Sequence, residues 1–271
     1  MNRILIFLVL ICSGFGCFQE RIEIDNNKDE NKKIVITGWI SSLAEPQFVN
    51  VSRTVNYLGS IGIDQVSGAL VTLTDESDSY ALTEQAAGVY HLPETWQGKI
   101  GDNYELTVTV EGKTYTAKEK MRACPEIENL TYELDPDVGE IETEKIYVTS
   151  FDFQEIVGEG DAYYGTDYVK GGLEGDSLFY GEYVDDEFSD GQYFEGIILG
   201  NGDNFELNDT VVVEIHSIGK AVSEYLQEIE NEIYRGGPFD PPPANVKTNM
   251  EGGAIGYFII SDARKAEIVI E

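Results

Sequence analysis

Residues 104–118, YELTVTVEGKTYTAK, decide the fold of this chain. In the first half of the stretch apolar side chains alternate with threonines, which is the period-2 pattern of a strand with one buried face. The tripeptide Glu111-Gly112-Lys113 interrupts this alternation, and a second strand-like run begins at Thr114. A glycine between two such runs is typical of a tight turn. The stretch therefore predicts an antiparallel β-hairpin.

Five further short runs with strand character precede this hairpin. Together they make seven strands in about 90 residues, which is the spacing of an immunoglobulin-like or transthyretin-like β-sandwich. We predict that this sandwich spans residues 34–121 and folds as a unit, with a linker at Arg122-Ala123-Cys124-Pro125. The five runs are residues 34–41, 48–54, 69–74, 79–82 and 89–92.

Residues 126–271 are predicted to form a second β-rich domain that carries one amphipathic helix near 220–235. The helix is indicated by five apolar side chains at helical spacing, and Gly236-Gly237-Pro238 follows as a stop signal. The predicted fold class is therefore mainly β. The helical positions are Val222, Tyr225, Leu226, Ile229 and Ile233, and the strand-like runs of this half are 145–153, 194–199, 210–216, 255–260 and 266–270.

The first residues have the pattern of an export signal. Asn2 and Arg3 precede the apolar run 4–11, and small residues lead from there to Gly16-Cys17. The run is too short to span a bilayer as a helix, which takes about 20 residues, so a cleaved signal over residues 1–16 is predicted. The Gly16-Cys17 junction resembles that of a bacterial lipoprotein, which implies lipidation of Cys17 and a polar tether over 17–33. The alternative is an ordinary secretory signal with an incidental cysteine.

The charge of the chain excludes one class of partner. The formal net charge is −32 at pH 7, and a surface that binds nucleic acid needs the opposite sign. A content of 42% hydrophobic and 11% aromatic residues nevertheless supplies a core. If Cys12 leaves with the signal and Cys17 is acylated, Cys124 has no partner within the chain. We predict that it is a small buried residue rather than a nucleophile.

Enzymatic motifs are scarce. The two histidines, His91 and His216, belong to no HExxH zinc motif, and the sequence contains no GxSxG nucleophile elbow. Both histidines are predicted to be structural or surface residues, and no catalytic residue, metal or cofactor is predicted. Paired carboxylates could hydrolyse a glycan, but among 50 acidic residues any such pair carries little information.

An acidic stretch rich in aromatic residues is the remaining candidate for function. Residues 171–219 contain twelve Asp and Glu but no Lys or Arg, and tyrosines are interleaved with the acids. Tyrosine offers an apolar face and a polar tip, which suits protein interfaces. We predict a partner or ligand surface at Tyr180, Tyr183, Asp185, Asp186, Glu187, Asp190 and Tyr193. The acids among them could instead bind calcium, although their spacing does not match an EF-hand loop.

Several phrases, in this order, make the chain similar to the domain-of-unknown-function 4249 lipoproteins of Bacteroidota. The glycines of the last phrase also suggest a turn that Asn249 can cap. The phrases are VITGWI at 35–40, VSGALVTLTD at 66–75, GVY at 88–90, GPF at 237–239 and TNMEGGAIGYF at 248–258.

The resemblance implies a lipoprotein of the outer membrane. We predict that it is non-enzymatic and faces outward. Such proteins are often encoded beside a TonB-dependent receptor, so the implied function is help in capturing a nutrient or ligand for that receptor. No catalytic residues are defined for the family. Two alternatives stay open: a glycan-acting secreted hydrolase subunit, and an adhesin-like binding module without a transporter.

Overall fold

The computed structural model describes residues 32–55, 62–135, 146–158, 161–171, 181–185, 190–199, 205–233 and 246–271. Lys32–Glu271 form one compact unit. The predicted signal, Cys17 and all but the end of the predicted tether lie outside the described residues. Within the described part of the chain, no helix has the length and apolarity needed to cross a membrane.

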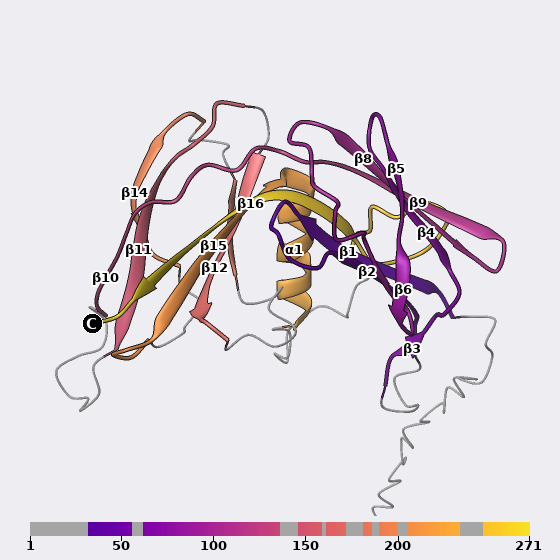
Figure 1. The fold of residues 1–271 in the computed structure, drawn as a ribbon, viewed down its shortest axis with the longest axis horizontal. Coiled ribbons are helices and arrows are strands. Elements are labelled where there is room, and N and C mark those ends of the chain that lie inside the picture. The colour runs from indigo at the N-terminus through magenta and orange to yellow at the C-terminus, as the bar shows by residue number, and fades with distance from the viewer. Residues whose placement is uncertain are drawn as a thin grey trace, which may run out of the picture. The chain divides into compact units, whose positions relative to one another are not determined.

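A nine-stranded sheet combines strands from both halves of the chain (Figure 1). Its order is β13-β12-β15-β16-β1-β2-β7-β6, and β3 pairs with β2. The pairing of β1 with β16 is parallel, whereas the other pairs are antiparallel. The strands are β1 Ile34–Ser41, β2 Phe48–Arg53, β3 Asp64–Gln65, β6 Thr83–Ala86, β7 Val89–His91, β12 Asp161–Val169, β13 Glu182–Asp185, β15 Thr210–Gly219 and β16 Phe258–Val269.

Two smaller sheets pack against this large sheet. One has the order β5-β4-β8-β9 and the other β10-β11-β14. The first consists of β4 Leu70–Thr74, β5 Ser79–Ala81, β8 Asn103–Val110 and β9 Lys113–Lys120. The second consists of β10 Glu128–Leu134, β11 Tyr147–Gln154 and β14 Tyr193–Ile197.

Both smaller sheets cover the same face of the large sheet. Along β16, Phe258 and Ile260 point into the core under the four-stranded sheet. Two residues further on the same face, Asp262 accepts a hydrogen bond from the backbone of Cys124, which lies in the core under the three-stranded sheet. Because alternate residues of a strand share a face, a single sheet backs two sandwiches.

The hairpin predicted from residues 104–118 is confirmed as β8 and β9. Their register pairs Val110 with Lys113, so Glu111 and Gly112 form a two-residue loop. Both loop residues have positive φ, 52° and 81°, which is the conformation of a type I′ turn. The inward side chains Leu106, Val108 and Val110 are buried, as the alternation predicts.

The last strand, β16, belongs to both halves of the molecule. Its residues Phe258 to Ser261 pair with β1, and its residues Asp262 to Val269 pair with β15. The sequence interpretation that 255–260 and 266–270 are two separate strands was wrong, because polar residues in the middle of this single strand are buried rather than in a turn. Strands β3, β6, β10, β12 and β13 were not anticipated.

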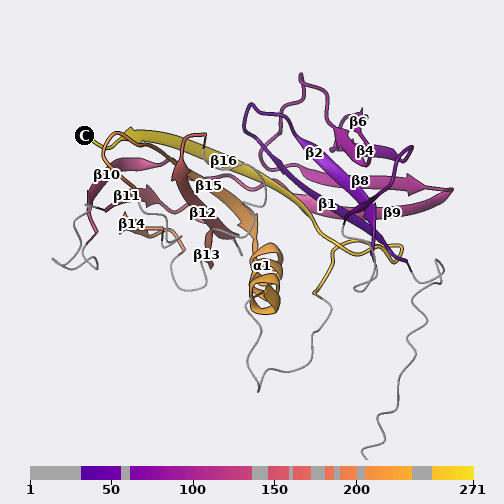
Figure 2. The ribbon, with the colours of Figure 1, turned by 90° about the horizontal axis from the view of Figure 1, so that it is seen from below.

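Helix α1, Lys220–Ile233, lies on the opposite face of the large sheet (Figure 2). Val222 and Leu226 are buried against Ile218 and Ile259, and the ring of Tyr225 stacks on Tyr257 with 4.1 Å between centroids. The predicted apolar stripe is therefore confirmed for its first two turns. Ile233, at the end of the helix, is 54% exposed.

The glycine phrase at 252–256 forms the approach to β16, and its conformation requires glycine. Gly256 has φ 98°, and a Cβ atom there would lie 2.1 Å from the carbonyl oxygen of Ile36. The predicted cap at Asn249 is also present, since its side chain accepts a hydrogen bond from the N–H of Phe258 and donates one to its carbonyl. The phrase thus fixes the point at which the chain joins β1.

The fold class is confirmed as mainly β, with several sheets and one helix. The division into domains at 34–121 and 126–271 stays a prediction. Four residues of the C-terminal half nevertheless belong to the core of the N-terminal sandwich, namely Met250, Ala254, Phe258 and Ile260.

The packing of these C-terminal residues in the N-terminal core gives the first testable prediction. A fragment of residues 32–121 loses the parallel partner of β1 and burial worth roughly 5 kcal/mol, because three large apolar side chains are removed from its core. We expect the fragment alone to be largely unfolded by circular dichroism and to gain β-structure when a peptide of residues 246–261 is added. A fragment that folds equally well without the peptide would contradict this expectation and support an autonomous sandwich.

Candidate functional site

The structure describes only part of the predicted acidic surface. Tyr180, Asp186 and Glu187 lie outside the described residues. Asp185 ends β13 with its backbone paired to Ala162, but its side chain is also outside the described part. Among the residues that the structure does describe, no group of three or more His, Cys, Asp or Glu is placed to hold a metal ion. The calcium alternative at these acids remains untested.

Tyr183 and Tyr193 lie on different sheets. Tyr183 is on β13, and its hydroxyl donates to the carboxylate of Glu230 on α1. Burial and this carboxylate raise the pKa of Tyr183 to about 12, so the phenol stays protonated and ties the helix to the sheet edge.

Asp190, another residue of the predicted surface, lies in the turn before β14 and accepts a hydrogen bond from the N–H of Gly158 at 3.0 Å.

Tyr193 is the exposed member of the predicted set. It opens β14 and is 47% exposed. Its hydroxyl lies 3.2 Å from a carboxylate oxygen of Asp152 and 3.3 Å from one of Glu128. Tyr193 therefore contributes to the outer face of the three-stranded sheet, whereas Tyr183 supports the helix.

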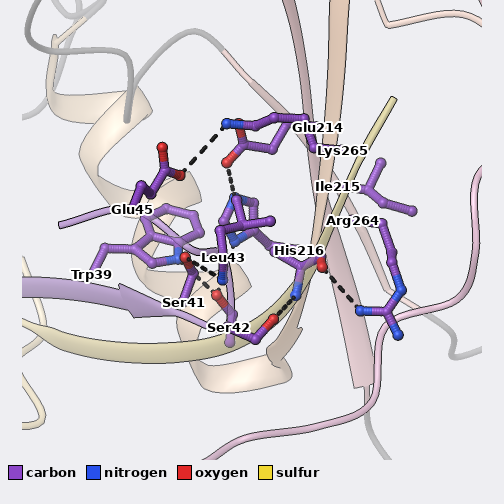
Figure 3. A network of polar contacts seen from close by, with 12 residues as sticks. Trp39, Ser41, Ser42, Leu43, Glu45, Glu214, Ile215, His216, Arg264 and Lys265 are labelled. Atoms are coloured by element: carbon purple, nitrogen blue, oxygen red, sulfur yellow. Dashed lines mark hydrogen bonds and ion pairs between the residues drawn. The ribbon is translucent and has the colours of Figure 1, made fainter. Parts of the chain in front are cut away.

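A network of polar side chains lies where β16 changes partner from β1 to β15 (Figure 3). Sequence reasoning missed it, because its members come from three separate segments of the chain. Trp39 is on β1, Glu214 and His216 are on β15, and Ser261 is on β16. Loop residues Ser42 and Glu45 reach the network from the connection between β1 and β2.

The centre of the network is a chain of three hydrogen bonds. Trp39 Nε1 lies 2.9 Å from Ser261 Oγ, which lies 2.9 Å from His216 Nδ1, and His216 Nε2 lies 2.7 Å from Glu214 Oε1. An indole N–H can only donate and an ionised carboxylate can only accept, so Trp39 donates to Ser261 and His216 Nε2–H donates to Glu214. In the tautomer that carries its single proton on Nε2, His216 accepts the Ser261 hydroxyl proton at Nδ1.

Glu214 is the charged end of this chain. Its side chain is 13% exposed, and Lys265 Nζ lies 2.9 Å from its second oxygen. Burial alone would raise its pKa, but hydrogen bonds from His216 and Lys265 outweigh burial and lower the pKa of Glu214 to about 2. The same contact with Glu214 raises the pKa of Lys265 against the opposing effect of burial. The pair is therefore ionised at neutral pH.

A second carboxylate binds the linker and the loop to β16. Asp262 is 1% exposed, and one of its oxygens accepts from Ser42 Oγ at 2.6 Å and from Arg264 Nη1 at 2.9 Å. Its other oxygen accepts from the backbone N–H of Cys124 at 2.9 Å. Both carboxylate oxygens of Asp262 are buried away from water, and both accept hydrogen bonds from the protein.

The order Ser261, His216, Glu214 resembles a nucleophile, base and acid, but its geometry differs from that of a catalytic triad. Ser261 is 0% exposed, and its oxygen already accepts the indole N–H of Trp39. The serine binds His216 Nδ1 and the acid binds Nε2, which is the reverse of the triad arrangement. In this conformation the hydroxyl cannot reach a substrate, and the network joins β1, β15 and β16.

The structure also describes the predicted buried cysteine and the two histidines. Cys124 is 2% exposed, and burial raises its pKa, which confirms the prediction of a small buried residue. His216 is buried with both ring nitrogens bonded, as expected of a structural histidine. His91 lies at the surface beside Phe48, with 5.3 Å between ring centroids.

A pocket of about 470 Å³ opens on the four-stranded sheet beside Asp75, Asn103, Glu105 and Lys118. Burial would raise the pKa of Asp75, but an ion pair with Lys99 at 2.8 Å and backbone N–H donors lower it. Asp75 is therefore held as a carboxylate. Glu105 faces Lys118 at 3.4 Å. These two carboxylates have the contacts of structural groups rather than those of a proton donor and its partner.

The Glu214 network predicts a loss of stability in acid. A carboxylate whose pKa falls from 4.5 unfolded to about 2 folded stabilises the protein above pH 4.5, and this contribution disappears as pH falls through 2. We expect the free energy of unfolding of the wild type to fall by roughly 3 kcal/mol more between pH 5 and pH 2 than that of Glu214→Gln. Denaturant unfolding at several pH values measures this.

The exposed carboxylate Glu94 supplies the control variant Glu94→Gln, which should follow the wild type. Equal pH dependence of Glu214→Gln and the wild type would show that Glu214 is not the group responsible.

Comparison with known proteins identifies a family and distant structural similarities. The family model described as "Domain of unknown function (DUF4249)" matches residues 19–267. No curated protein matches the chain. Among solved structures, a segment of two fibronectin type-III domains from chicken tenascin is similar at 11% sequence identity and a TM-score of 0.21, over 68% of this chain and 88% of that chain.

Proposed function

Because the chain belongs to the family of the domain of unknown function DUF4249, we propose that it is a lipid-anchored outer-membrane protein that assists a TonB-dependent receptor. In this proposal the protein is not an enzyme, and it acts by binding a nutrient, another ligand or the receptor itself. The protein faces outward from the membrane. Its predicted lipid is attached to Cys17.

The observation that carries the proposal is the Gly16-Cys17 junction, which follows a charged start and a short apolar run. The family model begins at residue 19, two residues after this cysteine. A cysteine in that position supplies an anchor, and the polar residues 17–33 supply the reach between membrane and fold.

The polar network at His216 supports a binding role over catalysis. Ser261, His216 and Asp262 are buried and Glu214 is 13% exposed, and each is hydrogen-bonded within the network, so they hold the sheets in place. The remaining candidates for function are exposed sheet faces. Broad exposed faces suit contacts with another protein or a large ligand.

The anchor has a direct test. In Cys17→Ala, the lipid attachment is lost while the fold beyond residue 32 is untouched, so the protein should move from the membrane fraction to the soluble fraction. The lipid chains of a bacterial lipoprotein hold a protein firmly, so the shift should be nearly complete. Detergent-phase partition followed by immunoblotting measures it, with Cys124→Ala as the matched cysteine control. An unchanged membrane fraction for Cys17→Ala would refute the anchor.

The partner has a separate test. We expect affinity purification of the full chain from detergent-solubilised native membranes to recover a TonB-dependent receptor in stoichiometric amount. Recovery of no partner would favour the adhesin-like alternative. Release of sugar from a glycan by the purified protein would instead favour the hydrolase alternative.

A further inference from the structure

The outer face of the three-stranded sheet β10-β11-β14 has no basic residue. Its strands read ENLTYEL, YVTSFDFQ and YFEGI, and the side chains on its outer side include three exposed carboxylates and one half-buried carboxylate, Asp152. This sheet lies at the left of Figure 1, and its inner side packs on β12 and β15. We call its outer side the acidic face. Its charged members are Glu128, Glu133, Asp152 and Glu195.

Two of these carboxylates are placed against each other. Glu128 of β10 is the direct cross-strand partner of Asp152 of β11. Both reach the hydroxyl of Tyr193, at 3.3 and 3.2 Å, although a phenol has only one proton to donate. Like charges directly opposite each other destabilise an antiparallel pair. Within the described residues, neither carboxylate has an ion pair with Lys or Arg.

The corresponding position on the other small sheet has the opposite arrangement. There Glu105 of β8 faces Lys118 of β9 in register, 3.4 Å away. Other exposed carboxylates are also paired, such as Glu111 with Arg53 and Glu267 with Lys170. Among the described residues the pair Glu128 and Asp152 has no such cation. Asp152 instead accepts hydrogen bonds from Asn129 Nδ2 and from the N–H of Gly196, each at 2.7 Å.

Exposed apolar and aromatic side chains lie on or shortly after two strands of the same sheet. Tyr193, the first residue of the edge strand β14, is 47% exposed. Ile198 follows β14 and is 41% exposed, and Val157 follows β11 and is 79% exposed. A half-exposed tyrosine between carboxylates can hold a cationic side chain by ion pairing and by contact with its ring.

We propose that the acidic face is the docking surface for a protein partner, and that lysine or arginine side chains of the partner lie between Glu128 and Asp152 over Tyr193. The cations of the partner relieve the repulsion between the two carboxylates. The charge also speeds the encounter, since fields of opposite sign steer association. This inference rests on the proposed partner-binding function and names the face and the chemistry that carry it.

Photo-cross-linking in native membranes tests the face. The photoreactive residue p-benzoylphenylalanine replaces Thr131, which is exposed on β10, or in a matched protein Thr107, which is on the outer side of β8. We expect a cross-linked product from position 131, with a contact peptide that contains Lys or Arg by mass spectrometry. We expect less product from position 107. A tetra-arginine peptide added as competitor should reduce the product, and tetra-glutamate should not.

The charge is tested by Glu128→Gln in the position-131 protein. This variant keeps a hydrogen-bond acceptor and removes one charge, so the cross-linking yield at low salt should fall about threefold or more. Its melting temperature should stay equal or rise, since the repulsion with Asp152 is lost. Glu105→Gln removes one charge from the other small sheet and should leave the yield unchanged.

Other results overturn the inference. These are no product from position 131, a contact peptide without Lys or Arg, or equal yields from Glu128→Gln and the unmutated protein. If a receptor still co-purifies in such a case, the proposed function stands and its contact lies on another face. If position 131 cross-links through cations to a protein other than a TonB-dependent receptor, the docking face stands and the proposed partner is wrong.

Discussion

The whole structure depends on one strand that hydrogen-bonds to two different halves of the molecule. Up to Ser261, β16 is the parallel neighbour of β1, and from Asp262 it is the antiparallel neighbour of β15. The large sheet is continuous only through this change of partner. Both smaller sheets then pack on one face of it, and α1 packs on the other. Two sandwiches that could have been independent modules therefore share a single backing layer.

Buried polar groups lie at the point where the partner changes. Taking charged and polar side chains out of water costs free energy, and it is tolerated here because Trp39, His216, Glu214 and Lys265 satisfy one another. An apolar junction could slide by a residue or two along β16. A chain of directed hydrogen bonds with one acceptor for each donor permits only the observed register.

The parts of the fold that follow from local patterns could be predicted from the sequence. The hairpin at 104–118 has strict alternation and a glycine turn, and α1 has a clear apolar stripe, so both were found. Strand β12, DAYYGTDYV, was missed because both of its faces are covered, and a strand buried on both sides shows no alternation.

The candidate site was beyond sequence reasoning for a related reason. Trp39 and Ser261 are 222 residues apart, and no local sequence pattern around either residue indicates that the two lie in contact. One local signal was available. The polar run Ser261-Asp262-Ala263-Arg264-Lys265 interrupts an apolar strand, and it was interpreted as a turn between two strands. Its length without Gly, Pro or Asn argued for buried polar residues instead. The acidic composition of 171–219 led to the prediction of a partner surface that includes Tyr193, and that role of Tyr193 stays a prediction.

The position of β16 near the end of the chain also determines when the N-terminal core can be completed during folding. A chain that emerges from a channel N-terminus first presents β1 early, and the neighbour that completes its core arrives only with residue 258. Contacts between such distant residues raise the contact order, which slows folding because a long loop must be ordered first. Until the final segment is available, β1 lacks its parallel neighbour and the N-terminal core lacks Phe258 and Ile260, so apolar side chains of that core stay open to water.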